Sequence, residues 1–387
     1  MRHERRRGQR SRERGKRGVA LSASVALKAL RAHAVRRSLF APTDLATAID
    51  SLGFVQLDPI RAPARAADLI LRHRVAGYRA GDLDRAYPQM PLAEDYVHVY
   101  GVMPGRTQNL LHPRAPYSWQ VEHSHPHLAR LIVAHVRAHG VTHPRDLGRT
   151  LGKVSVGNGW GGNSAATTRM LEALQYRGKL RVARREGGIR LYDLAQPRPR
   201  PRAASARTRE IFMLLLRLYA PLPEASFRRL ARMATGNSVD TEARAAVMAH
   251  MHDEGSLRRI EMAGTMFILP AEETTLAEAE DRVRLLAPFD PVVWDRDRFE
   301  LFWGWEYRLE AYTPPAKRRF GYYALPLLWR DDIIGWANAA KVNGTLRVTA
   351  GFAKARPRGP AFRRALEAEV AALATAVGAA NFTIAAR

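Results

Sequence analysis

The feature that most constrains the fold is an order of elements that occurs twice along the chain. In residues 127–140, apolar side chains recur at three- and four-residue spacing, which predicts an amphipathic helix. A short second helix is expected over 142–152, and a third over 164–178, opened by Ser164. Two segments of alternating residues joined at 186–188 then predict a β-hairpin. Three helices followed by a hairpin form a winged helix-turn-helix.

The repeat divides the chain into predicted segments. A winged helix spans residues 121–195, a linker rich in Pro and Arg spans 196–206, and another winged helix spans 207–272. Upstream, three helical patterns indicate a first winged-helix unit over 21–120, with the stretch FVQLDPI as a strand. Residues 280–387 are rich in aromatic and β-branched side chains, which predicts an antiparallel α+β unit. The predicted fold class is therefore mainly α with β wings (α+β).

The charge of the chain favours a polyanionic partner. The formal net charge is +25, of which residues 1–17 contribute +7 and the remainder +18. Such an excess favours nucleic acid, because Lys and Arg neutralise phosphates and release counterions. Only seven of the 62 basic residues are Lys, so compositional drift is the alternative explanation. We expect double-stranded DNA as the partner and residues 1–20 as a disordered, Arg-rich tail.

Several classes of protein are excluded or disfavoured by what the sequence lacks. The chain has no Cys, so it has no disulfide, thiol nucleophile or Cys-ligated metal. No apolar run approaches the roughly 18 residues that cross a bilayer, and we expect a cytoplasmic protein without a membrane partner. His123, His125 and His127 lie close together, but their spacing in a loop does not suit a metal, so no metal site is predicted. No phosphate-binding or dinucleotide motif occurs, and no cofactor is expected.

An amide and a carboxylate share one side of a short apolar run. Gln56 and Asp58 are two residues apart, so in a strand they point the same way while Leu57 points into the interior. Pro59 places this segment at a strand end, near solvent. The pair is therefore a candidate site, although an exposed turn ended by Asp-Pro is the plain alternative.

A second polar pair lies further along the chain. Glu94 and His98 are four residues apart and would lie on one face of a helix. His98 has an ordinary pKa near neutrality, which suits proton transfer, and a structural histidine is the alternative.

Five stretches in this order resemble the winged-helix DNA glycosylases that release alkylated bases and unhook interstrand crosslinks, the YcaQ-like or AlkZ-like family. Residues 56–58 match its Gln–hydrophobic–Asp triplet, and EDYVHVYGVMP resembles its Glu-Tyr-Trp-x-His element. The remaining stretches are NGWGGNSAATTRMLEAL, APFDPVVWDRDR and PPAKRRFGYYALP. The resemblance covers about residues 21–352. The chain departs from the pattern at Val97, at Phe320 and at Asn338, which falls near a usual Asp.

The resemblance implies a monofunctional glycosylase acting on N7-alkylated purines and on interstrand crosslinks. Asp58 would stabilise the charge that develops on the sugar and would orient or deprotonate the attacking water. Gln56 would fix the water or the sugar, and His98 and Glu94 would support the site or contact the lesion. A lyase route needs a lysine amine at the sugar, and no Lys lies near the triplet.

Basic residues near two of these stretches are candidate DNA contacts, although solvated charge is the alternative. They are Arg61, Arg65, Arg72 and Arg74 beyond the triplet, and Lys317, Arg318 and Arg319 in the C-terminal unit. The alternative function is a non-enzymatic transcription regulator that binds DNA through tandem winged helices. Without sustained coiled-coil heptads, we expect a monomer.

Overall fold

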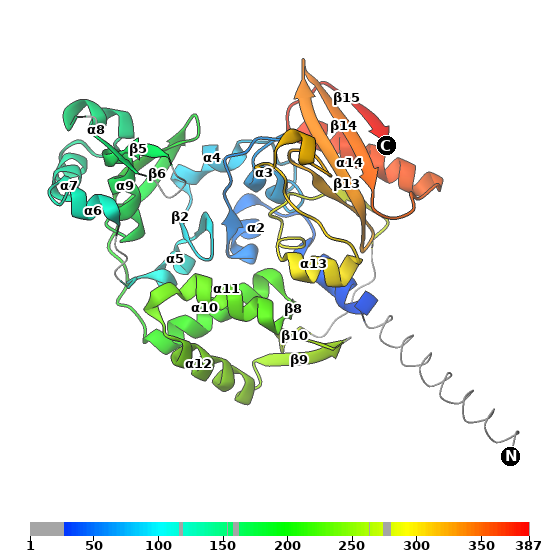
Figure 1. Ribbon diagram of the computed structural model, residues 1–387, viewed down its shortest axis with the longest axis horizontal. Helices are drawn as coiled ribbons and strands as arrows, with labels where there is room; N and C mark the ends of the chain where they lie inside the picture. The colour runs from blue at the N-terminus through cyan, green and yellow to red at the C-terminus, as the bar shows by residue number, and fades with distance from the viewer. Residues whose placement is uncertain are drawn as a thin grey trace, which may run out of the picture. The chain divides into compact units, whose positions relative to one another are not determined.

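The computed structural model describes residues 27–115, 119–152, 154–157, 162–262, 264–273 and 280–386. The chain forms two compact units, each assembled from separate stretches (Figure 1). One unit comprises residues 42–214 and 229–250, and the other comprises residues up to 41, 215–228 and 251 onward. Helices and strands both occur along the whole described chain, so the fold is mixed α/β, with more strand than a mainly α protein with β wings would have. The predicted tail, residues 1–20, lies outside the described residues.

The first stretch combines short helices with a three-stranded sheet. Its elements are α2 (Leu45–Leu52), β1 (Val55–Gln56), α3 (Ala66–Leu71), α4 (Asp82–Ala86), η1 (Tyr87–Gln89), β2 (Leu92–Tyr96), β3 (Tyr100–Pro104) and α5 (Gly105–Leu111). The sheet has the order β1-β3-β2. Asp44 caps α2 by accepting from the Thr47 N–H at 3.0 Å, and Gly53 ends the helix with φ of 69°. The strand predicted between the second and third helices is present as β1, which lies between α2 and α3.

The first predicted helix belongs to the other unit. Residues 27–38 are helical, and Leu30, Ala34 and Val35 are buried in a hydrophobic cluster with Phe299 and Trp303. The predicted first winged-helix unit, 21–120, is therefore divided, because its amphipathic helix buries its apolar face on residues far away in the sequence.

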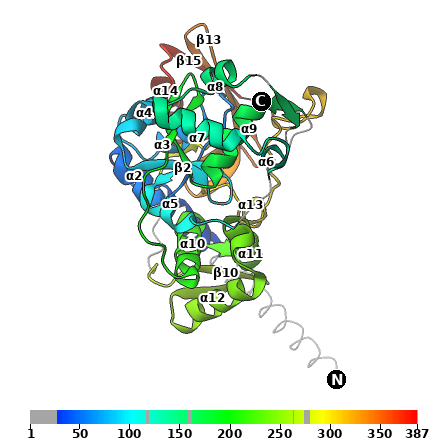
Figure 2. The same ribbon diagram turned by 90° about the vertical axis from the view of Figure 1, so that its left-hand side faces the viewer.

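The second stretch has the predicted order of elements. It contains α6 (Gln120–Ser124), α7 (Leu128–His139), α8 (Pro144–Thr150), β4 (Ser155–Gly157), β5 (Asn163–Ala165), α9 (Ala166–Tyr176), β6 (Leu180–Glu186) and β7 (Ile189–Leu194). The helices α7 and α8 pack against α9 (Figure 2), and the hairpin turns at the predicted glycines. Ser164 does not open α9, because Ser164 pairs within β5 and Ala165 is the N-cap residue.

The third stretch contributes to both units. Its elements are α10 (Ala204–Tyr219), β8 (Leu222–Pro223), α11 (Glu224–Thr235), η2 (Gly236–Ser238), α12 (Thr241–Asp253), β9 (Leu257–Met262) and β10 (Thr265–Pro270). The strands form a sheet with the order β8-β10-β9. The expected linker ends earlier than predicted, because α10 begins at Ala204.

The C-terminal stretch forms a five-stranded sheet with the order β11-β12-β13-β14-β15. Its elements are β11 (Val283–Leu285), α13 (Arg296–Trp303), η3 (Pro315–Lys317), β12 (Leu325–Trp329), β13 (Asp332–Val342), β14 (Thr345–Phe352), α14 (Pro360–Ala376) and β15 (Asn381–Ala386). β15 runs parallel to β14, which corrects the expected purely antiparallel unit. The intervening α14 provides the crossover that a parallel pair requires (Figure 1). Among the described residues, no helix is long and apolar enough to cross a membrane.

Candidate active site

The polar pair lies where β1 ends. β1 pairs antiparallel with β3, and the Leu57 N–H continues the pairing by donating to the Tyr100 carbonyl at 3.0 Å. The extended backbone therefore reaches Leu57, and Asp58 follows directly after it. Both polar side chains are half-buried. Leu57 is also only half-buried, so it does not point into a closed interior as the sequence suggested.

The carboxylate of Asp58 is partly removed from water and receives a hydrogen bond from the backbone. Its Oδ1 accepts from the Ile60 N–H at 2.9 Å, which closes a turn after Pro59. Burial raises the pKa of Asp58 above its ordinary value, and this single donor, which acts in the opposite direction, does not offset the effect. A partly desolvated carboxylate that stays open to solvent is suited to bind a proton or to face a cationic group.

Glu94 and His98 do not share a helix. Glu94 lies in β2, opposite Val102 of β3, and His98 lies in the turn between these two strands. The predicted helical face is wrong, because alternating residues in this stretch pair into a hairpin. Glu94 is buried and accepts from the Tyr100 hydroxyl at 2.7 Å and from Arg185 Nε at 2.7 Å. This ion pair ties the sheet of β1 to the hairpin strand β6.

His98 packs behind the polar pair. Its ring centroid lies 5.3 Å from that of Phe54, which comes two residues before Gln56. Burial lowers the pKa of His98 to about 3, so the imidazole is neutral at physiological pH. His98 can therefore support the sheet or donate one hydrogen bond, but it does not supply a proton near neutrality.

Two polar clusters behind the sheet were missed by sequence reasoning. Gln175 of α9 donates to the Glu94 carbonyl at 2.8 Å and to the Tyr100 hydroxyl at 3.0 Å. Asp95 is fully buried and pairs with His112 and Arg114, each at 2.8 Å. Burial alone would raise the pKa of Asp95, but these partners lower it. No local spacing relates such residues, so no motif could have identified them.

The basic residues beyond the triplet have different surroundings. Arg61 is exposed and lies close to the tip of the β6–β7 hairpin. A Cβ atom added to Gly188 at this tip would lie 3.4 Å from Nη2 of Arg61. Arg65 pairs with Asp68 at 3.3 Å and with Asp84 at 2.9 Å.

Arg72 is half-buried, but Arg74 is wholly enclosed. Arg74 is 0% exposed, and its Nη1 donates to the Ile70 carbonyl at 2.8 Å. A buried guanidinium cannot contact a phosphate, so the expectation for Arg74 is wrong. The spacing of the basic residues in this segment did not reveal that Arg74, which follows the short helix α3, is enclosed.

The second predicted basic patch lies in the C-terminal unit, between η3 and β12. Lys317 and Arg319 are exposed, whereas Arg318 is half-buried and donates to the Thr313 carbonyl at 2.7 Å. Lys317 and Arg319 are thus accessible to a polyanion, whereas Arg318 also holds the loop through its hydrogen bond to Thr313.

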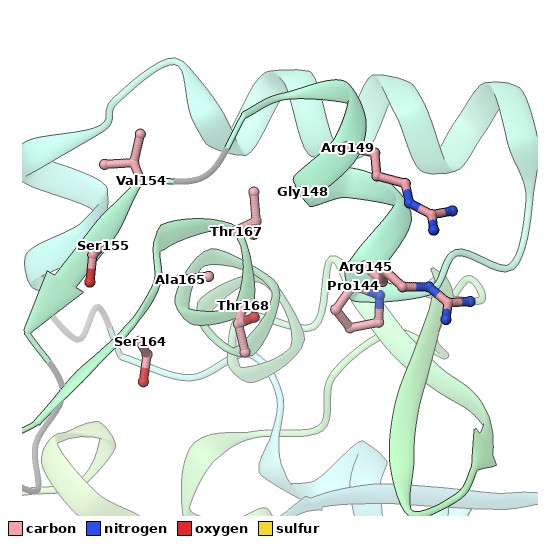
Figure 3. A pocket seen from close by; sticks show the side chains of 10 residues that line it. All are labelled: Pro144, Arg145, Gly148, Arg149, Val154, Ser155, Ser164, Ala165, Thr167 and Thr168. Carbon is pink, nitrogen blue, oxygen red and sulfur yellow. The ribbon is translucent and has the colours of Figure 1, made fainter.

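A groove of about 560 Å³ lies between α8, β4, β5 and α9 (Figure 3). Arg145 and Arg149 extend side by side from α8 on one side of it, and Ser155 and Ser164 lie on the other side (Figure 3). Asp146 contacts Arg149 at 3.6 Å. Guanidinium and hydroxyl donors are common phosphate contacts, so the groove suits a nucleic-acid backbone.

No group of three or more metal-binding side chains is assembled within the described ranges. His123, His125 and His127 are described and do not form such a group.

A partly buried carboxylate two residues from an amide, on a fold with basic and hydroxyl-lined surfaces, is compatible with a DNA-processing enzyme. The model of the family described as DNA glycosylase AlkZ-like matches residues 49–376. The chain belongs to this family and is therefore a DNA glycosylase, an enzyme of DNA repair. The resemblance noted in the sequence is confirmed, and a non-enzymatic regulator is disfavoured.

A solved structure has the same fold. The DNA glycosylase AlkZ of Streptomyces sahachiroi is similar with a TM-score of 0.60 and 16% sequence identity, over 92% of this chain and 98% of that chain. At this identity the similarity concerns the fold.

Proposed function

We propose that this glycosylase hydrolyses the N-glycosidic bond of N7-alkylated purines in double-stranded DNA and unhooks interstrand crosslinks, with Asp58 and Gln56 as its catalytic residues. The observation that carries the proposal is the half-exposed carboxylate of Asp58, placed beside an amide and only partly compensated by hydrogen bonds. Such a carboxylate can face a developing cation without first breaking an ion pair.

The chemistry follows from the substrate. An N7-alkylated guanine is cationic, so the electron pair of the breaking glycosidic bond neutralises the departing base. Positive charge grows on the deoxyribose, and the carboxylate of Asp58 stabilises it. Water then adds to the anomeric carbon and passes a proton to Asp58, which leaves an abasic sugar. Gln56, with one acceptor and two donors, orients that water or the sugar.

We propose supporting roles for the residues behind the strand. The Glu94–Arg185 ion pair holds β2 against β6. His98, packed on Phe54, keeps the apolar backing of the triplet in place. Both residues act by positioning β1 rather than by contacting the reacting atoms.

We propose that the remaining surfaces hold the DNA. Arg61, the exposed cations Lys317 and Arg319, and the groove between α8 and α9 supply donors for backbone phosphates. In this proposal residues 121–195 and 207–272 are tandem winged helices, and the enzyme acts as a cytoplasmic monomer.

A base-release assay tests the proposal. Wild type and Asp58→Asn are incubated with duplex DNA carrying N7-methylguanine, and abasic sites are cleaved by heat and counted. A crosslinked duplex, resolved on a denaturing gel, tests unhooking in parallel. We expect release by wild type and loss of release in the variant, whereas full activity in Asp58→Asn would remove Asp58 from the chemistry.

A further inference from the structure

A loop in the C-terminal unit presents aromatic rings to solvent beside several cations. Tyr312 is 85% exposed and Tyr322 is 45% exposed, although large aromatic side chains are usually buried. Lys317 and Arg319 between them are exposed, and no acidic residue occurs in residues 311–325. The surface is therefore both aromatic and strongly basic.

Hydrogen bonds to buried or partly buried side chains hold the loop in a fixed shape. The buried carboxylate of Glu310 accepts from three backbone N–H groups, those of Arg319 at 2.9 Å, Phe320 at 2.7 Å and Gly321 at 3.1 Å. Asn338 of β13 donates to the Phe320 carbonyl at 2.7 Å. Binding on such a surface costs little ordering entropy, because the loop is already in place.

Arg318 contacts the backbone next to one exposed tyrosine and the ring of the other. Its Nε donates to the Thr313 carbonyl at 2.7 Å, directly after Tyr312, and its guanidinium carbon lies 5.1 Å from the centre of the Tyr322 ring. A cation held on a ring in this way also leaves its planar face available for stacking.

We infer that the loop 311–322 binds unpaired nucleobases of DNA, with Tyr312 as the stacking platform and the flanking cations on the backbone. A ring exposed on a basic loop can stack on any base whose face is uncovered. Bases within a duplex have both faces covered by their neighbours, so a duplex would use the cations but not Tyr312. The inference rests on the proposed function in one respect, because opening the duplex around a lesion is what supplies unpaired bases.

Two labelled oligonucleotides test the inference, one single-stranded and one a hairpin whose fully paired stem is closed by a polyethylene glycol linker instead of unpaired nucleotides, with Kd measured by fluorescence anisotropy on the full chain. For Tyr312→Ala we expect the Kd of the single strand to rise about five- to tenfold, with less than a twofold change for the hairpin. Tyr312→Phe keeps the ring and should restore single-strand binding. Phe382→Ala, at a partly exposed ring of β15 in the same unit, is the matched control and should change neither Kd.

The cations are tested separately. Lys317→Gln should weaken both oligonucleotides and reduce the salt dependence of binding by about one counterion. Equal losses on both DNAs in Tyr312→Ala, or no loss on either, would overturn the stacking role. Base release by wild type is measured alongside: if it is absent while Tyr312-dependent binding persists, the proposed function fails and this inference stands.

Discussion

Two carboxylates of this protein meet opposite electrostatic environments. Asp58, at the end of β1, receives one backbone N–H and has a raised pKa because burial dominates. Glu310, in the C-terminal unit, also loses water, but three backbone N–H donors reverse the effect and lower its pKa. The number of fixed donors therefore separates a carboxylate available for chemistry from one that shapes a loop.

The largest expected effect is on the chemistry at Asp58. Replacing Asp58 by Asn should reduce base release about 10²- to 10³-fold, because a preorganised charge is removed from the transition state. The melting temperature should stay the same or rise, since the folded state no longer holds a partly desolvated charge. Single-turnover base release and thermal unfolding measure the two quantities on the same preparation.

Asp44→Asn is the matched control for that experiment. Asp44 is an exposed carboxylate that caps α2, and Asn caps a helix equally well. Its base release should equal that of wild type. A comparable loss in both variants would mean that negative charge in general, rather than Asp58, supports the reaction.

At Glu310 the expected effect is on stability instead. Glu310→Gln keeps the shape but removes the charge that three backbone donors share, which should lower the free energy of unfolding by about 2 kcal/mol. Base release at a temperature where the variant is folded should change far less than in Asp58→Asn. Urea unfolding gives the stability, and a loss of activity without a loss of stability would contradict the distinction between the two carboxylates.

A glycine in the same loop gives an effect on stability of similar size. Gly321 has φ of +121°, and a Cβ there would lie 2.2 Å from Asn338 Oδ1, so Gly321→Ala should cost about 1–3 kcal/mol. Gly77→Ala is the matched control, because Gly77 also has positive φ (+65°) but nothing within 4 Å of the added atom. Unfolding curves of the two variants measure what the φ of +121° and the contact with Asn338 add together beyond an ordinary left-handed position, and equal costs would show that neither carries weight.

The smallest effect is the pH dependence, about 1.4 kcal/mol for each pH unit. Because the pKa of Asp58 is raised, base release should fall tenfold per unit on an acid limb whose midpoint lies above the ordinary value of 3.8. Glu310 affects stability in the same direction but at lower pH: its contribution is present above 4.5 and is lost only as pH falls through the lowered pKa. The rate of base release by wild type, measured against pH, gives the midpoint for Asp58. The free energy of unfolding of wild type and Glu310→Gln, measured against pH, gives the contribution of Glu310. A midpoint at or below 3.8 for base release would contradict the environment described for Asp58.

Local patterns in the sequence determined much of the fold and the centre of the site. The apolar spacing of α7, the glycines between β6 and β7, and the long helix α14 each depend on residues close together in the chain. The short strand that ends at Gln56, two residues before Asp58, was recognisable from alternation and from Pro59 for the same reason.

Only the tertiary structure decided what surrounds these elements. The partner of Glu94 is Arg185, 91 residues away, and the helix over residues 27–38 buries its apolar face in the C-terminal unit. Arg74 and Arg61 look alike in the sequence, yet one is enclosed and the other exposed. Burial and pKa depend on residues brought together by folding, and neither periodicity nor spacing along the chain encodes which distant groups will meet.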